Sequence, residues 1–321
     1  MQLIKELGNG ATKKAFLYEA DGQRIVILQA VRKSKQRSLI WQARREANIT
    51  QNLPPLPCDI RTVYVKRRQG KWEVSAHYVE GEALDKQLFD TLTQEDKEKL
   101  ITDFAEFLIA LHSLPVDMLG ERYADEADKR GLRYYLGAFC YKIYCLKKTY
   151  LSLKKPWENP YKTRKFAKEK NSLYRQLDLT PAATDQLESV LRAVCKHPDL
   201  FAYAGVCFGD FFGSNFVYNK VTRQIGILDF VCSYKNNIYS DFAGILTWMG
   251  EEFTQHLIQT YNTLAQQRRV KLPKCTAPTP EIDFTMVQHL AALWLFPRAA
   301  KNPKRKEELL ALLQALYPTP A

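Results

Sequence analysis

One acid–amide–acid series near the middle of the chain constrains the fold more than any other feature of the sequence. Asp210 and Asn215 stand five residues apart in the run Val-Cys-Phe-Gly-Asp-Phe-Phe-Gly-Ser-Asn-Phe-Val-Tyr at 206–218. Asp229 lies fourteen residues further on, near the end of the apolar run Ile-Gly-Ile-Leu-Asp-Phe at 225–230. In phosphoryl transfer, a carboxylate orients the attacking hydroxyl and oxygen ligands hold the magnesium ions that bridge the phosphates. The series therefore predicts that the fold brings this loop and this strand end to one point.

The first 80 residues are predicted to form short strands around one helix. Residues 17–20 lead through Asp21-Gly22, a hairpin turn signal, into the β-branched run at 24–28. The elements expected after this hairpin are a helix over 37–53, which Pro54-Pro55 ends, and two strands over 61–66 and 72–79.

After Gly81 the pattern changes to long helices. Thr93 is an N-cap signal, and Phe104, Leu108 and Leu111 recur at helical spacing on one face. With 321 residues, of which 46% are hydrophobic, the chain can bury the cores of two coupled lobes. A strand-rich small lobe followed by a helical large lobe is the expected organisation.

The acid–amide–acid series resembles that of the aminoglycoside phosphotransferase and choline kinase family, relatives of the protein kinases. Their catalytic loop is usually His-Gly-Asp-x-x-x-x-Asn, and their metal-binding strand ends in Asp-Trp or Asp-Phe. The resemblance implies an α+β, protein-kinase-like bilobal fold with a nucleotide-binding lobe in 1–80 and a helical catalytic and substrate lobe in 81–321. It also implies ATP and Mg²⁺ as cofactors, Asp210 as catalytic base, and Asn215 and Asp229 as magnesium ligands.

Other motifs resemble the family in the same order along the chain. Gly8 and Gly10 lie in Leu-Gly-Asn-Gly-Ala-Thr, where a glycine-rich loop could place backbone N–H groups over phosphates. Glu46 lies on the first predicted helix, where the family has the acid that pairs with a strand lysine. The segment that follows the strands resembles the linker between the lobes, which implies that backbone groups of His77 and Val79 bind adenine.

Two later motifs complete the resemblance. Leu-His-Ser-Leu-Pro at 111–115 resembles a helix ending that recurs in the family, and His112 is expected to be structural rather than catalytic. Asp241, in Ser-Asp-Phe-Ala, resembles the helix-start acid that commonly follows the metal-binding strand.

The first departure from the family pattern concerns positive charge. Gln29 stands at the aligned position of the third-strand lysine, which would neutralise phosphate charge. Glutamine offers only neutral hydrogen bonds, which are about half as strong as charge-assisted ones. Lys33, or Lys13 and Lys14 near the glycine loop, could supply the charge instead.

Two further departures lie beside the expected catalytic residues. Phe208 replaces the usual histidine two residues before Asp210, and an aromatic ring could brace the loop by packing. Val231 replaces the glycine that follows Asp-Phe in protein kinases. A catalytically inactive, kinase-like binding module therefore stands as the alternative, although retention of the whole acid–amide–acid series argues against it.

The net charge of +12 is concentrated in one segment. Residues 129–175 hold 14 Lys or Arg, only two acids and ten aromatic residues, whereas the charges of the remaining chain cancel. In the resembled family this region lines the acceptor pocket, so the segment disfavours a polycationic acceptor and suits an anionic one, such as a sugar acid, a phosphorylated sugar or a lipopolysaccharide core sugar. In an inactive module, the same segment could instead bind RNA or an anionic membrane surface. An ordinary helical pair with a solvated basic face is the structural alternative.

The remaining composition excludes several other chemistries. Seven cysteines form no Cys-x-x-Cys pair, and the start of the chain lacks a secretory pattern, which together favour reduced thiols and a cytoplasmic location. No apolar run is long enough to span a membrane. The sequence has no His-Glu-x-x-His, Gly-x-Ser-x-Gly or P-loop motif, which disfavours metalloprotease, serine hydrolase and P-loop enzymes.

Overall fold

The structure is a computed structural model of the chain. Apart from a few isolated positions between 143 and 192, it describes residues 1–9, 13–68, 71–119, 203–211, 213–272, 281–299 and 302–316. The basic, aromatic segment 129–175 lies outside these residues except for Ile143, so the expectations placed on it stay predictions.

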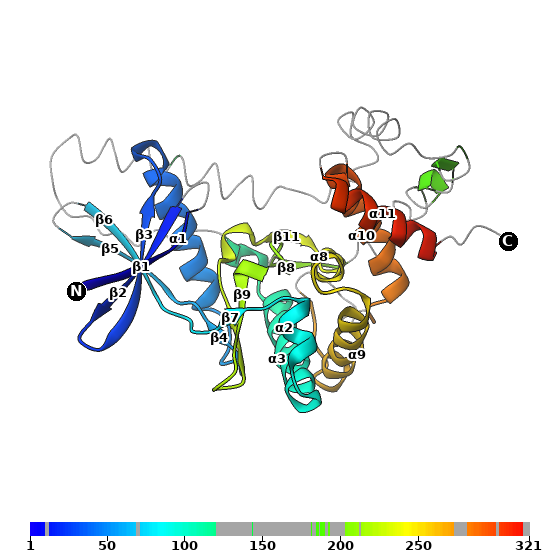
Figure 1. Ribbon diagram of the computed structural model, residues 1–321, viewed down its shortest axis with the longest axis horizontal. Helices are drawn as coiled ribbons and strands as arrows, with labels where there is room; N and C mark the ends of the chain where they lie inside the picture. The colour runs from blue at the N-terminus through cyan, green and yellow to red at the C-terminus, as the bar shows by residue number, and fades with distance from the viewer. Residues whose placement is uncertain are drawn as a thin grey trace.

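A five-stranded antiparallel sheet forms the N-terminal part of the chain, in the order β1-β2-β3-β6-β5 (Figure 1). Its strands are β1 Gln2–Asn9, β2 Lys13–Ala20, β3 Gln23–Ala30, β5 Val63–Arg68 and β6 Lys71–His77. The predicted hairpin joins β2 to β3, and its turn residues Asp21 and Gly22 have φ values of 51° and 74°. Asp and Gly suit this turn because both tolerate the left-handed backbone region better than other residues do.

Helix α1, Gln36–Thr50, packs on one face of this sheet and corresponds to the helix predicted at 37–53. Leu17 and Val26 of the sheet share a buried apolar cluster with Leu39 and Ala43 of the helix. Period-two alternation along the strands and helical spacing along α1 explain why these residues meet.

The C-terminal part is mainly helical, as predicted, and Figure 1 shows its later helices at the opposite end of the molecule from the five-stranded sheet. Its helices are α2 Lys86–Thr91, α3 Gln94–Ser113, α8 Tyr239–Met249, α9 Glu251–Gln267, α10 Phe284–Ala299 and α11 Pro303–Leu316. Thr93 caps α3 as predicted, because its hydroxyl oxygen accepts a hydrogen bond from the Asp96 backbone N–H at 3.2 Å. Among the described residues, no helix combines the length and apolar character needed to cross a membrane.

Two small sheets lie between these parts. One has the order β4-β10-β9-β7, and the other pairs β8 with β11. Their strands are β4 Asp59–Ile60, β7 Glu82–Ala83, β8 Ala204–Cys207, β9 Phe216–Asn219, β10 Gln224–Ile227 and β11 Tyr234–Asn237. The β4–β10 pairing is parallel and joins the first 80 residues to the rest of the chain. A boundary between lobes at residue 80 stays a prediction.

The linker after β6 packs closely against the β9–β10 hairpin. A Cβ atom on Gly226 would lie 2.3 Å from Val79 Cγ1 and 2.5 Å from Val217 Cγ2, so only glycine leaves room for the linker valine. Gly81 has a φ of +154° and approaches the Tyr218 backbone, where a Cβ atom would lie 2.9 Å away. The two glycines therefore let the linker lie directly on the strands that carry the candidate site.

Replacing Gly226 with alanine should destabilise the fold by about 1–3 kcal/mol, because both valines would have to shift in a packed region. Urea unfolding of the two proteins measures this difference. Gly8→Ala is a matched control, since a Cβ atom on Gly8 meets nothing within 4 Å. Equal free energies of unfolding for wild type and Gly226→Ala would contradict the packing described for the linker.

Candidate active site

The acid–amide–acid series converges in space. Asp210 follows β8, Asn215 ends the short 3₁₀ turn Gly213–Asn215 before β9, and Asp229 follows β10. The Asn215 side-chain amide donates to the Asp210 backbone carbonyl at 2.9 Å, and the Leu228 backbone N–H donates to the Asn215 carbonyl at 2.8 Å. These hydrogen bonds tie the predicted catalytic loop to the strand end that carries Asp229.

Asp229 has a strained backbone and a partly buried carboxylate. Its φ and ψ of 63° and 67° place it in the left-handed region, which costs a residue other than glycine about 1–2 kcal/mol. One carboxylate oxygen, Oδ2, forms an ion pair with Lys13 Nζ at 2.8 Å. The other, Oδ1, is buried without a hydrogen bond and lies 3.9 Å from Arg61 Nη2. Strain of this kind persists at functional sites, where the surrounding structure holds it in place.

The charges around the two acids shift their pKa values in opposite directions. Burial raises the pKa of Asp210, and the like charge of Asp229 adds to this effect, while the nearby Asn215 amide opposes it. Burial would also raise the pKa of Asp229, but Lys13 and Arg61 hold it below its ordinary value. Partial desolvation, followed by the charges of both acids, raises the pKa of the Cys232 thiol to about 11. Asp229 therefore lies close enough to Asp210 for its charge to raise the pKa of that carboxyl group.

Glu46 pairs with Arg61 rather than with a strand lysine. Arg61 Nε donates to Glu46 Oε1 at 2.9 Å, and Nη2 approaches the same oxygen. Both residues are buried, with 1% of Glu46 and 8% of Arg61 exposed. The parallel pairing of Ile60 with Ile227 places Arg61 beside the end of β10 and hence near Asp229. Arg61 could not be recognised from the sequence as a site residue, because no local motif distinguishes it from arginines on the surface.

The structure does not bring Gln29 to the acidic residues. Gln29 is exposed and stands opposite Lys14, whereas the neighbouring positions Val26 and Leu28 point into the core beneath α1. Lys33 is exposed as well. Of the three lysines that the sequence left as sources of positive charge, Lys13 is the one that contacts Asp229.

The remaining predicted nucleotide residues lie near the sheet ends. Gly8 is exposed near the end of β1, and Gly10 lies outside the described residues. His77 ends β6, where its backbone N–H donates to the Thr62 carbonyl at 3.1 Å. Val79 follows in the linker that packs against Gly226. Adenine binding through His77 and Val79 stays a prediction.

Phe208, at the position of the family histidine, is fully buried among aromatic rings. Its ring centroid lies 5.2 Å from that of Phe230, the residue after Asp229, in an edge-on arrangement. The rings of Phe211 and Phe216 lie 5.3 Å and 5.1 Å away. Edge-on and tilted aromatic contacts of this kind stabilise a core beyond their buried area. The phenylalanine therefore braces both loops by packing, as the sequence analysis allowed.

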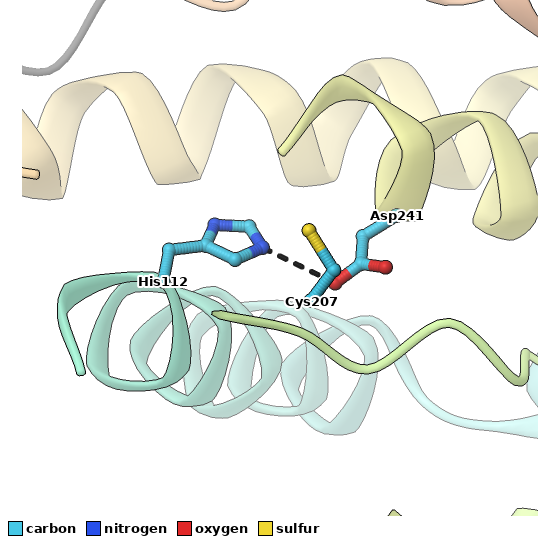
Figure 2. A group of neighbouring side chains, drawn as sticks. All are labelled: His112, Cys207 and Asp241. Atoms are coloured by element: carbon cyan, nitrogen blue, oxygen red, sulfur yellow. Dashed lines mark hydrogen bonds and ion pairs between the residues drawn. The ribbon is translucent and has the colours of Figure 1, made fainter. Parts of the chain in front are cut away.

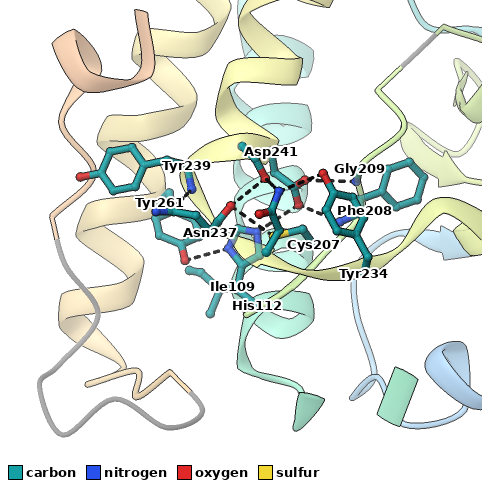
Figure 3. A network of polar contacts seen from close by, with 12 residues as sticks. Ile109, His112, Cys207, Phe208, Gly209, Tyr234, Asn237, Tyr239, Asp241 and Tyr261 are labelled. Atoms are coloured by element: carbon teal, nitrogen blue, oxygen red, sulfur yellow. Dashed lines mark hydrogen bonds and ion pairs between the residues drawn. The ribbon is translucent and has the colours of Figure 1, made fainter. Parts of the chain in front are cut away.

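Asp241 fixes the backbone of the predicted catalytic loop just before Asp210. Its carboxylate accepts hydrogen bonds from the backbone N–H groups of Phe208 at 2.8 Å and Gly209 at 3.1 Å (Figure 3). His112 Nε2 lies 3.2 Å from the same carboxylate, and His112 Nδ1 lies 3.1 Å from the Tyr261 hydroxyl. The loop that carries Asp210 is thus anchored to the starts and ends of buried helices.

His112, Cys207 and Asp241 also form a compact group of potential metal ligands, with donor atoms within 4.8 Å of one another (Figure 2). Each of these residues already has a protein partner. The hydrogen bonds of His112 and Asp241 are those given above, and the Cys207 thiol donates to the Asn237 carbonyl at 3.4 Å. Burial raises the pKa of this thiol well above its ordinary value, which disfavours the thiolate that metals bind. The group is a hydrogen-bonded brace, in agreement with the structural role predicted for His112.

A protein-family model described as the phosphotransferase enzyme family matches residues 4–272. The chain belongs to this family. Membership confirms the predicted class of enzyme, a small-molecule kinase that uses an alcohol group as acceptor. None of the curated proteins compared with the sequence matches it.

Solved structures of the family share the fold. The ADP-bound aminoglycoside phosphotransferase APH(2'')-Ib is 19% identical, with a TM-score of 0.55 over 98% of this chain and 92% of that chain. A ternary complex of APH(2'')-IIa with streptomycin and ATP is also 19% identical, with a TM-score of 0.56 over 98% and 93%. Macrolide 2'-phosphotransferase MphH from Brachybacterium faecium is 12% identical, with a TM-score of 0.53 over 100% and 93%. These likenesses confirm the predicted α+β, kinase-like bilobal fold.

Restoring the histidine of the family at position 208 should destabilise this chain. The imidazole would be buried among Phe107, Phe211, Phe216 and Phe230, and an unpartnered buried polar group costs about 1–3 kcal/mol. Chemical denaturation of Phe208→His measures the loss, and Phe208→Leu is the apolar control. A histidine variant as stable as wild type would show that the pocket accepts a polar ring.

Proposed function

We propose that this kinase transfers the γ-phosphate of ATP, in the presence of Mg²⁺, to a hydroxyl group of a small acceptor. The observation that carries the proposal is the convergence of Asp210, Asn215 and Asp229 on loops that hydrogen bonds tie together. Solved structures of similar phosphotransferases name ATP and ADP in some cases and GDP in others, which supports a nucleotide donor, and ATP is the donor that we propose.

The residues present fit a magnesium site. Asp229 offers a buried carboxylate oxygen that makes no hydrogen bond, and such an orphaned acceptor is suited to a hard cation. Asn215 uses its amide nitrogen toward Asp210, which leaves its amide oxygen as the atom that could bind the metal. Asp229 and Asn215 would hold Mg²⁺ there, and the ion would supply positive charge that stabilises the negative charge developing during transfer.

Asp210 is the residue proposed to orient the acceptor hydroxyl and receive its proton. The hydrogen bond from Asn215 and the Asp241 contacts to Phe208 and Gly209 hold its loop in a fixed conformation. Positioning of this kind contributes much of the rate in phosphoryl transfer, since the reaction needs little covalent help from the protein. The backbone of His77 and Val79 would hold adenine at the linker, and Glu46 would brace the small lobe through Arg61.

An anionic acceptor suits the charges near Asp210. Arg298, on α10, stacks over the Trp294 ring with its guanidinium carbon 3.6 Å from the ring centroid. Burial and the charge of Arg305 lower the pKa of Arg298, and the charge of Asp210 is among the weaker effects that oppose them. A cation on which the charge of the proposed base acts could pair with a carboxylate or phosphate of the acceptor, as in a sugar acid, a phosphorylated sugar or a lipopolysaccharide core sugar. The positive charge of the basic segment 129–175 also favours an anionic acceptor.

Replacing each acid should separate the two proposed roles. Asp210→Asn should lower kcat roughly 10²- to 10⁴-fold, because it removes the group that accepts the proton, while nucleotide binding is kept. Asp229→Asn should weaken Mg²⁺-dependent ATP binding itself. Thermal unfolding with and without Mg²⁺ and ATP reports binding directly, since ligand at 100 times its Kd adds about 2.7 kcal/mol of stability.

An inactive module would behave differently in the same experiment. Wild-type protein would gain little stability from Mg²⁺ and ATP, and it would bind single-stranded RNA or anionic vesicles in a salt-sensitive manner. Normal turnover by both Asp210→Asn and Asp229→Asn would overturn the assignment of the site.

A panel of hydroxylated acceptors should show a preference set by charge. Sugar acids and phosphorylated sugars should support ATP turnover, and polycationic aminoglycosides should not. Arg298→Met should raise KM for the anionic acceptors roughly 10-fold or more, because it removes a charge-assisted contact, and leave KM for ATP unchanged. Turnover with aminoglycosides that exceeds turnover with every anionic acceptor would contradict this preference.

A further inference from the structure

Asp229 is held by two cations that come from different places in the N-terminal part of the chain. Lys13 contributes from β2, and Arg61 follows β4. Their side chains are only 17% and 10% exposed. Charged side chains are rarely so little exposed unless they are paired or bind a ligand. Two cations at one carboxylate therefore indicate a role in binding.

Strand register explains how Lys13 reaches the inner face of the sheet. Residues directly opposite each other in antiparallel strands share a face, and Lys13 stands opposite Ala30 while Leu17 stands opposite Val26. Leu17 and Val26 belong to the cluster beneath α1, so the alternation of side chains places Lys13 and Ala30 on that face as well. Ala30 has no side chain beyond its Cβ atom, which leaves space for the lysine. The inner face of the sheet therefore has a cation on the second strand, where the resembled family has one on the third.

We propose that Lys13 is the phosphate-binding cation of the nucleotide site, and that it pairs with Asp229 only while the site holds no nucleotide. The inference rests on the proposed function and deepens it. Arg61 takes a separate task, because it is bound to Glu46 and fixed by the β4–β10 pairing. Two residues thus divide the phosphate contact and the pairing with the α1 acid between them.

The exchange of partners by Lys13 follows from electrostatics. An ammonium group and a divalent cation repel each other strongly if both stay within about 3–4 Å of the same carboxylate. Lys13 therefore leaves Asp229 when a metal ion binds there, and the negative phosphates of a nucleotide attract its ammonium group away from the carboxylate even without metal. Its nitrogen is buried and, beyond this ion pair, has no hydrogen-bond partner among the described residues, so its donors can turn to phosphate oxygens. The flexible four-carbon stem of lysine permits that movement.

The test compares three ligands on the full chain by titration calorimetry: magnesium-free ADP, adenosine, and Mn²⁺ alone. In Lys13→Met, ADP should bind roughly 10- to 100-fold more weakly, the usual effect of losing a charge-assisted contact. Adenosine, which has no phosphate, should bind as it does to wild type. Mn²⁺ alone should bind more tightly, because Lys13 no longer competes for Asp229. A lysine that only supports the fold would not change the affinities of ADP and Mn²⁺ in opposite directions.

Matched variants keep the test specific. Lys14→Met removes the neighbouring charge from the other face of the sheet and should leave all three affinities unchanged. Lys13→Arg keeps the charge and should retain most of the ADP affinity. The exchange Lys13→Ala with Ala30→Lys returns the cation to the third strand, directly across the pair, and should restore ADP binding to within about 10-fold of wild type.

The outcomes separate the inference from the proposed function. Wild-type protein that binds neither ADP nor adenosine would overturn the proposed nucleotide site itself. Wild-type protein that binds both, together with a folded Lys13→Met variant of unchanged ADP affinity, would overturn only the role of Lys13. If Lys13→Met does not fold, the exchange variant decides: tight ADP binding supports the inference, and a folded exchange variant without it refutes the inference.

Discussion

Buried charge must be paired, and this requirement organises the junction between the β-rich and helical parts of the molecule. Four charged side chains meet there, and their formal charges cancel. Lys13 comes from β2 and Glu46 from α1. Arg61 follows β4, and Asp229 follows β10. Leaving one member of a buried ion pair without its partner typically costs about 3–5 kcal/mol. The elements that carry these side chains therefore hold one another in register, and Asp229 keeps its left-handed backbone within that frame.

Much of the fold, and the acidic residues of the candidate site, could be predicted from the sequence. The Asp21-Gly22 turn, the Thr93 cap and the change from strands to helices after Gly81 are local signals, and local signals survive folding when tertiary contacts agree with them. The acid–amide–acid series was equally informative, because its chemistry requires Asp210 and Asp229 to meet. Spacing and chemistry together predict the two loops and the carboxylates that they carry.

What the sequence could not predict depends on contacts between distant strands. Arg61 becomes a partner of Glu46 only because a two-residue strand, β4, pairs with β10, 167 residues later in the chain. Strands that short have no periodicity to detect. The choice between Lys13 and Lys14 depends on which face of the sheet each side chain occupies, and cross-strand register settles that face. Lys33 lies beyond β3 and is exposed.

The register of β2 against β3 also bears on how relatives of kinases are judged to be active or degenerate. If activity were judged from the third-strand position alone, Gln29 in place of the lysine would class this chain as a pseudoenzyme. In space, that glutamine faces solvent and an ammonium group from the adjacent strand occupies the vicinity of Asp229. The absence of lysine at one position therefore does not mean that the site lacks a positive charge. A sounder criterion for degeneracy would ask whether any cation, from whichever strand, reaches the aspartate that ends the metal-binding strand.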